Sequence, residues 1–184
     1  MKIRSAATGL LLFASLTFAQ QDNPASPAAA QDKAARPSPP AKATCSLGDG
    51  ATVTVDYSSP RAKGRKIFGG LVPYGEVWRL GANEATTFVV SSGVTVGGTR
   101  VPAGSYTLFA VPNADKWTLV ISKKTGEWGT KYAGLDSDLA RVDMKTSTLP
   151  SPMENFTITF DKTGPGCTMR VEWEKARASV DITK

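Results

Sequence analysis

The chain has 184 residues, with 22 Lys and Arg against 16 Asp and Glu, and a formal net charge of +6. It contains two cysteines and no histidine. The length suits one domain of ordinary size. The absence of histidine excludes Ser-His-Asp triads and imidazole-based metal sites, and two cysteines cannot form a four-thiolate zinc site.

The N-terminus has the three parts of a secretory signal peptide. Lys2 and Arg4 supply the positive end, residues 9–18 form a mostly apolar run, and the small residue Ala19 occupies a cleavage position. An apolar run of this length is too short for the roughly twenty residues that span a bilayer, which argues against a membrane anchor. We therefore expect residues 1–19 to be a signal peptide. The protein would be periplasmic or secreted, with no transmembrane segment after cleavage.

Residues 20–43 have the composition of a disordered linker. They consist largely of Ala, Pro, Gln, Ser and Asp, and five prolines keep them extended and unable to join a core. The globular domain is then expected over 44–184. The leader removes two positive charges, and the linker carries three basic and two acidic residues, so this domain has a charge near +3. So small a charge, without a recognised motif, does not predict nucleic-acid binding.

Cys45 and Cys167 lie near opposite ends of the expected domain. Two cysteines in an exported protein usually pair, and the chain has no Cys-x-x-Cys motif that would indicate a redox centre. We therefore predict a structural disulfide between them. A reactive thiol is the functional alternative.

Apolar and polar residues alternate with a period of two in most of the domain, which is typical of half-buried strands. Gly97-Gly98 lies between two short β-branched runs and predicts a tight hairpin. The segments with strand-like patterns lie at 52–57, 86–91, 94–96, 99–101, 105–111, 116–122, 139–146, 156–160, 168–174 and 177–183.

This pattern predicts an all-β fold. About eight or nine short strands separated by Gly- and Pro-containing turns favour an antiparallel β-sandwich of two sheets, in which a jelly roll is one arrangement. A barrel is the alternative. No internal repeat indicates a propeller or a solenoid.

Residues 58–87 interrupt the strands with a long Gly-rich loop. Loops of this length in a compact domain are usually functional or mobile. Arg61, Lys63, Arg65 and Lys66 fall within six residues and are followed by a mixed aromatic and polar set. That set comprises Tyr74, Glu76, Trp78, Arg79, Asn83 and Glu84.

Two segments resemble the DUF2911 family, a bacterial exported domain of unknown function. They are SPRAKGRKIFGGLVPYGEVWRLGANEATTF at 59–88 and VPAGSYTLFAVP at 101–112. The resemblance extends from about Thr52 to Ile182. It implies an exported, β-rich protein and supplies no activity, cofactor or catalytic residue.

Each notable residue of the loop has a structural and a functional interpretation. The basic cluster is either a solvated loop or an anion site built from guanidinium groups and glycine amides. Arg79 either forms an ion pair with Glu76 or Glu84, or it contacts a ligand. Asn83 either caps a turn or donates a hydrogen bond to a ligand. The aromatic rings, including Trp128 and Tyr132 of another loop, serve either packing or a ligand platform. The candidate ligand-binding residues are Arg65, Lys66, Tyr74, Trp78, Arg79, Asn83 and Glu84.

Three functions remain open. The favoured one is a binding module for a small anionic or carbohydrate-like ligand. The second is an envelope structural or protein-interaction domain. An exposed apolar patch at Phe68, Leu71, Val72 and Trp78 would favour this function. The third is a hydrolase that uses two carboxylates, for which Glu76 and Glu84 are the nearest pair.

No cofactor and no metal ion are expected, and no catalytic residue can be named. Asp136, Ser137 and Asp138 offer oxygen ligands for a cation, but their spacing is not that of an EF-hand loop. The expected partner is a small molecule or an envelope protein.

Overall fold

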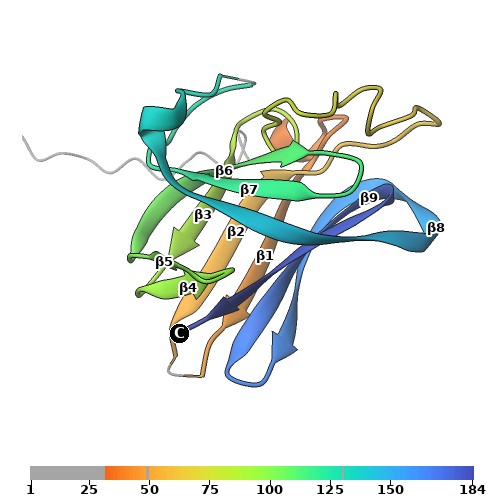
Figure 1. Ribbon diagram of the computed structural model, residues 1–184. Coiled ribbons are helices and arrows are strands. Elements are labelled where there is room, and N and C mark those ends of the chain that lie inside the picture. The colour runs from red at the N-terminus through yellow and green to blue at the C-terminus, as the bar shows by residue number, and fades with distance from the viewer. Residues whose placement is uncertain (1–31, 49, 130) are drawn as a thin grey trace, which may run out of the picture.

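The computed structural model describes residues 32–48, 50–129 and 131–184. The predicted signal peptide and the first part of the predicted linker lie outside these residues. No helix in the described ranges is long and apolar enough to cross a membrane. Besides a short helical turn at 32–34, the elements of the described residues are nine strands and one short 3₁₀ helix (Figure 1). They are β1 Pro40–Ser46, β2 Thr52–Ser58, β3 Thr86–Val90, β4 Val94–Val96, β5 Thr99–Val101, β6 Gly104–Pro112, β7 Trp117–Ser122, η1 Leu135–Ser137, β8 Asp138–Thr163 and β9 Gly166–Thr183.

The strands form one antiparallel sheet in the order β1-β2-β3-β6-β7-β8-β9-β4-β5. This confirms the all-β class. The sheet is continuous because β8 pairs with β7 up to Met144 and with β9 from Lys145 onward. The division into two sheets and the jelly-roll arrangement are not confirmed.

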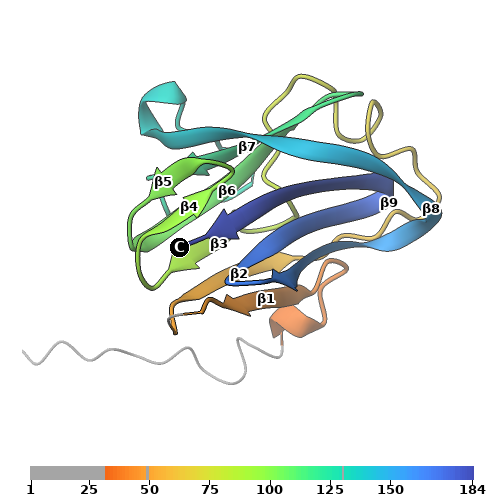
Figure 2. The same cartoon turned by 60° about the horizontal axis from the view of Figure 1, so that its bottom comes forward.

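β8 and β9 are much longer than the strands expected at their positions. β8 joins the expected strands 139–146 and 156–160, and β9 joins 168–174 and 177–183. The register of β8 shifts on either side of Met153, in a stretch that contains Pro150 and Pro152. Proline has no N–H for the ladder, so this stretch bulges, and a bulge lets a strand bend without ending. Figure 2 shows the resulting curvature of both strands.

The curved part of β8 lies near β1 and is joined to β2 by a side chain. The Tyr57 hydroxyl donates to the Ile158 carbonyl (3.4 Å) and accepts from the Ile158 N–H (3.0 Å). Cys45 in β1 and Cys167 in β9 lie at disulfide distance, with Cα atoms 6.6 Å apart, in agreement with the predicted pairing. The alternating apolar faces of β2, β7, β8 and β9 supply most of the buried side chains.

β1 begins earlier than composition suggests. Pro40–Ala43, which we assigned to the end of the linker, pair with Val55–Ser58 of β2. A β-ladder is made by backbone groups and does not require large apolar side chains, so a segment of Pro, Ala and Lys can join the edge of a sheet.

The predicted hairpin at Gly97-Gly98 is confirmed by the pairing of β4 with β5. Both glycines have positive φ, 52° and 87°, as a two-residue hairpin turn of this type requires. A Cβ on Gly97 would also lie 2.3 Å from a methyl group of Val142, so this position requires glycine for space as well.

Candidate functional site

The long loop between β2 and β3 spans residues 59–85 and is the yellow segment at the upper right of Figure 1. Its backbone is tied to the sheet at several points. Ala62 donates its N–H to the Glu154 carbonyl (2.8 Å), and Ile67 donates its N–H to a carboxylate oxygen of Glu174 (3.0 Å). Trp78 exchanges two 2.8 Å backbone hydrogen bonds with Ala110. The loop is therefore part of the folded scaffold.

Trp78 lies in an aromatic cluster inside the protein. Its side chain is only 8% exposed and stacks on Trp173, with ring centroids 6.0 Å apart and planes inclined by 18°. Phe156 lies 5.2 Å from it and Phe68 5.9 Å, both edge-on. The structure thus gives Trp78 a packing role and does not offer its ring as a ligand platform.

Arg65 folds back on its own loop. Its Nε donates to the Ala62 carbonyl (3.0 Å) and its Nη2 donates to the Arg61 carbonyl (2.6 Å). The Arg61 guanidinium likewise donates to the carbonyl (2.8 Å) and hydroxyl (2.9 Å) of Ser59. Two of the four basic residues therefore brace the loop, and the anion site that was one interpretation of the cluster is not assembled around their guanidinium groups.

Lys66 and Tyr74 meet in a cleft of about 430 Å³, here called the first cleft. The Tyr74 ring is 47% exposed and lies over Gly69, where an added Cβ would come within 2.6 Å of the ring. Gly69 also has a φ of 74°, so glycine is required there on both counts. The first cleft is lined by Lys66, Phe68, Tyr74, Asn113, Ala114, Trp117, Thr146, Ser147, Thr148, Glu174, Lys175, Ala176 and Arg177.

The first cleft is lined by four parts of the chain that are distant in sequence. They are the long loop, the β6–β7 turn, a stretch of β8 and a stretch of β9. The sequence analysis identified the contribution of the long loop and missed the other three. The hydroxyls of 146–148 and the basic residues of 175–177 have no local pattern that separates them from ordinary exposed strand positions.

Asn83 and Glu84 lie elsewhere and hold the segment that precedes β1. The Glu84 carboxylate accepts two hydrogen bonds from Arg36 (2.9 and 3.0 Å) and is paired with Lys33 at 3.2 Å. The Asn83 side-chain amide donates to the Ser38 carbonyl (2.9 Å). From composition, Lys33 and Arg36 were expected in a disordered linker. Their ion pairs with Glu84 could be identified only from the structure.

Arg79 has neither of the ion pairs that its structural interpretation proposed within the described residues. Its guanidinium donates to the Asn83 carbonyl at 3.4 Å, and burial lowers the pKa of its side chain. Glu84 is paired with Lys33 and Arg36 instead, and Glu76 lines a different hollow with Pro73 and Trp78. Because Glu76 and Glu84 share no cleft, the structure lends no support to a hydrolase built on this pair.

The Glu84 ion pairs predict an acid-sensitive contribution to stability. Burial raises the pKa of this carboxyl, but hydrogen bonds from its own backbone, Arg36 and Lys33 outweigh that effect and lower the net pKa. A carboxylate with a lowered folded-state pKa stabilises the fold above its unfolded pKa. This contribution is lost as the pH falls through the folded-state pKa. The stabilisation should therefore be full at pH 7 and decline below about pH 4.5, the ordinary value.

We expect Glu84→Gln to lower the free energy of unfolding at pH 7 by about 1 kcal/mol or less, as is usual for partly exposed ion pairs. The difference from the wild type should be smaller at pH 3, because the fall in pH protonates the Glu84 carboxyl and makes it more like the neutral amide. Urea denaturation of both proteins at the two pH values measures it. A difference of equal size at both pH values would contradict the assignment.

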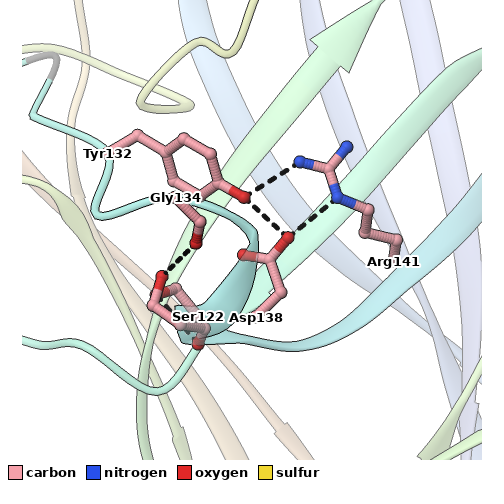
Figure 3. Close-up of polar contacts among 6 residues, drawn as sticks. Ser122, Tyr132, Gly134, Asp138 and Arg141 are labelled. Atoms are coloured by element: carbon pink, nitrogen blue, oxygen red, sulfur yellow. Dashed lines mark hydrogen bonds and ion pairs between the residues drawn. The ribbon is translucent and has the colours of Figure 1, made fainter.

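A polar cluster fixes the loop between β7 and β8 (Figure 3). The Asp138 Oδ2 accepts from the Tyr132 hydroxyl (2.7 Å) and from the Arg141 Nε (2.8 Å), and Arg141 Nη2 donates to the Tyr132 oxygen (3.0 Å). Burial, followed by the Asp138 hydrogen bond, raises the pKa of Tyr132. The hydroxyl of Ser137 donates to the Gly134 carbonyl (2.6 Å). The arrangement is that of a structural brace.

Asp138 therefore already has a hydroxyl and a guanidinium as partners. Nowhere in residues 32–48, 50–129 and 131–184 do three or more His, Cys, Asp or Glu side chains gather in a way that could hold a metal ion. Asp136, Ser137 and Asp138 thus have no further acidic ligands beside them in the described chain.

A family model described as "Protein of unknown function (DUF2911)" matches residues 38–182. The chain belongs to the DUF2911 family. The match begins just before β1 and ends within the last residues of β9, so it includes the whole sheet and the long loop. A search of curated proteins and a search of solved structures each found no match.

Proposed function

We propose that this domain is an exported binding module that holds a small anionic or carbohydrate-like ligand in the first cleft. The observation that carries the proposal is the convergence there of an exposed aromatic ring, two lysines and a row of hydroxyls. The volume of about 430 Å³ lies in the range of small-molecule sites. The predicted signal peptide and the cysteine pair support export to the periplasm or the cell exterior.

The charges of the first cleft favour an anion. Arg177 is paired with Glu172, and Glu174 accepts the backbone N–H of Ile67. Lys66 and Lys175 are in no ion pair within the described part of the chain. Two ammonium groups without a carboxylate partner are available to a phosphate, sulfate or carboxylate group, to which each can donate a charge-assisted hydrogen bond.

The remaining lining groups suit a polyol. Tyr74 presents an apolar ring face with a polar tip, and Asn113 carries both donors and an acceptor. Thr146, Ser147 and Thr148 follow one another along β8, although the Thr146 hydroxyl already donates to the Asp115 carbonyl (2.8 Å). A sugar ring packed on Tyr74 would place its hydroxyl groups within reach of such partners.

We expect inorganic phosphate or methyl glucoside to raise the Tm of the wild-type protein, because a ligand that binds only the native state stabilises it. Lys66→Gln should weaken phosphate binding about tenfold, the loss of roughly one charge-assisted hydrogen bond. Tyr74→Ala should weaken binding of the glucoside. Thermal-shift titrations at constant ionic strength measure both effects.

Lys63→Gln is the matched control, because Lys63 is an exposed lysine of the same loop that does not line the first cleft. Its titration curves should equal those of the wild type. Equal responses from Lys66→Gln and Lys63→Gln would place phosphate binding outside the first cleft. The absence of any shift with both compounds would count against the proposed function.

The apolar patch that would favour a protein-interaction domain is largely inside the molecule. Phe68, Val72 and Trp78 are buried, and Leu71 alone is exposed, at 50%. The envelope-interaction hypothesis therefore loses the feature on which it depended.

A further inference from the structure

A second cleft lies apart from the first and shares no lining residue with it. Its volume is about 380 Å³. It is bordered by the segment before β1, by residues of β2 and the start of β3, and by the loop after β7. Its lining residues are Lys33, Arg36, Pro40, Asp56, Tyr57, Ser58, Glu84, Ala85, Thr87, Gly126, Glu127 and Trp128.

Trp128 presents an exposed ring at this second cleft. Its side chain is 57% exposed, whereas Trp78, Trp117 and Trp173 are buried in the core. The backbone beneath the ring is held in place, because the Ala85 N–H donates to the Glu127 carbonyl and the Gly129 N–H donates to the Asn83 carbonyl, each at 3.1 Å. A large aromatic ring held at the surface by a fixed backbone is suited to contact a ligand.

Glu127 is the carboxylate of the second cleft that lacks a partner among the described residues. Glu84 is paired with Arg36 and Lys33, and Asp56 is paired with Lys42 at 3.2 Å. Glu127 is in no ion pair there, and its buried Oε2 accepts no hydrogen bond. Glu127 thus brings an unpaired negative charge to the second cleft, which favours a ligand that supplies a charged donor.

From this juxtaposition we infer that the second cleft binds a small organic cation that carries a primary ammonium group. The ammonium N–H donates to the Glu127 carboxylate, and its charge faces the Trp128 ring, the best of the aromatic side chains for a cation–π contact. Pro40 and Ala85 offer apolar surface to the carbon chain of the ligand. The inference goes beyond the proposed function, because the second cleft selects a charge opposite to that favoured by the first.

The exposed tryptophan provides the test. We expect n-butylammonium chloride to quench or shift the tryptophan fluorescence of the full-length protein saturably, and isothermal titration calorimetry to give the same affinity. Sodium chloride at equal ionic strength and 1-butanol, which lacks the charge, should produce no saturable change. Absence of saturation with n-butylammonium, or equal binding of 1-butanol, would overturn the inference. If methyl glucoside binds at this cleft and n-butylammonium does not, the inference is also overturned, because the cleft is then a polyol site.

Two variants locate the cation. Glu127→Gln keeps the shape of the side chain and removes its charge, and we expect n-butylammonium binding measured by calorimetry to weaken at least tenfold. Trp128→Ala should weaken it severalfold and also remove most of the fluorescence response. Glu76→Gln is the matched control, since Glu76 is an exposed carboxylate outside the second cleft, and its affinity should equal that of the wild type. Thermal unfolding checks that each variant is folded. Unchanged binding in folded Glu127→Gln would refute the assignment.

These results are separable from those for the first cleft. Glu127→Gln should leave the phosphate titration unchanged, and Lys66→Gln should leave n-butylammonium binding unchanged. Loss of both ligands in either variant would contradict the independence of the two clefts.

Discussion

Trp78→Ala is expected to lower the free energy of unfolding by about 3–5 kcal/mol, the usual cost of removing a buried aromatic side chain. The indole stacks on Trp173 and has Phe68, Phe156 and Trp117 around it edge-on, with centroid distances of 5.2 to 6.3 Å. Its removal would leave a cavity bounded by large rigid rings. Such rings cannot move in to fill the space without disturbing one another.

The backbone of Trp78 makes this cost hard to relieve. The residue is paired with Ala110 of β6 through two hydrogen bonds, so the chain cannot shift inward to replace the lost ring. Phe68, which lies against Trp78, also lines the first cleft. We therefore expect ligand binding in the first cleft to weaken together with stability.

Urea denaturation at pH 7 measures the effect, and Trp128→Ala is the matched control. It removes the same side chain from an exposed position, where substitutions usually change stability by no more than about 0.5 kcal/mol. Similar losses in the two variants would contradict the core role of Trp78.

The Cys45–Cys167 bridge is expected to make the second large contribution to stability. The two residues are 122 positions apart, and closing a loop of this length in the unfolded chain corresponds to about 4–5 kcal/mol in the chain-entropy model. The bridge connects β1, at one edge of the sheet, to the first residues of β9. Without it, β1 depends on its pairing with β2 and on its contacts with β8.

We expect the double variant Cys45→Ala, Cys167→Ala to lose about 2–5 kcal/mol of stability, the range found for native disulfides in small secreted domains. Reductant should destabilise the wild type by a similar amount and leave the double variant unchanged. Denaturation with and without reductant gives all four values. A wild type whose stability is insensitive to reductant, and whose two thiols react freely under native conditions, would show that no bridge forms.

Local patterns predicted the strands well where one face of a strand is buried. Val53, Val55 and Tyr57 in β2, and Met169, Val171 and Trp173 in β9, point inward as the alternation indicates. The same patterns missed the lengths of β8 and β9. The ladder continues through Pro150 and Pro152 by means of bulges, and a bulge interrupts the period of two on which the prediction depends.

The candidate site was predicted in part. The long loop was correctly marked as unusual, but its seven candidate residues do not meet in one place. Lys66 and Tyr74 line the first cleft, Glu84 lines the second, and Trp78 packs in the aromatic cluster. A tryptophan can be buried in a core or exposed at a surface, and the residue type alone does not show which. The sequence therefore could not show that Trp78 is buried and Trp128 exposed.

Length, composition and alternation by themselves determined that this chain is rich in β-strands. They also predict a leader, a cysteine pair and, without the leader and the linker, a domain charge near +3 in place of the +6 of the whole chain. The tertiary structure alone decided which charges are partnered. Arg36 and Lys33 pair with Glu84 across about fifty positions of sequence, whereas Lys66 and Glu127 are in no ion pair among the described residues and line two separate clefts. The physical reason is that alternation reports whether a side chain faces inward or outward. Ion pairs and clefts depend on which distant segments the sheet brings together.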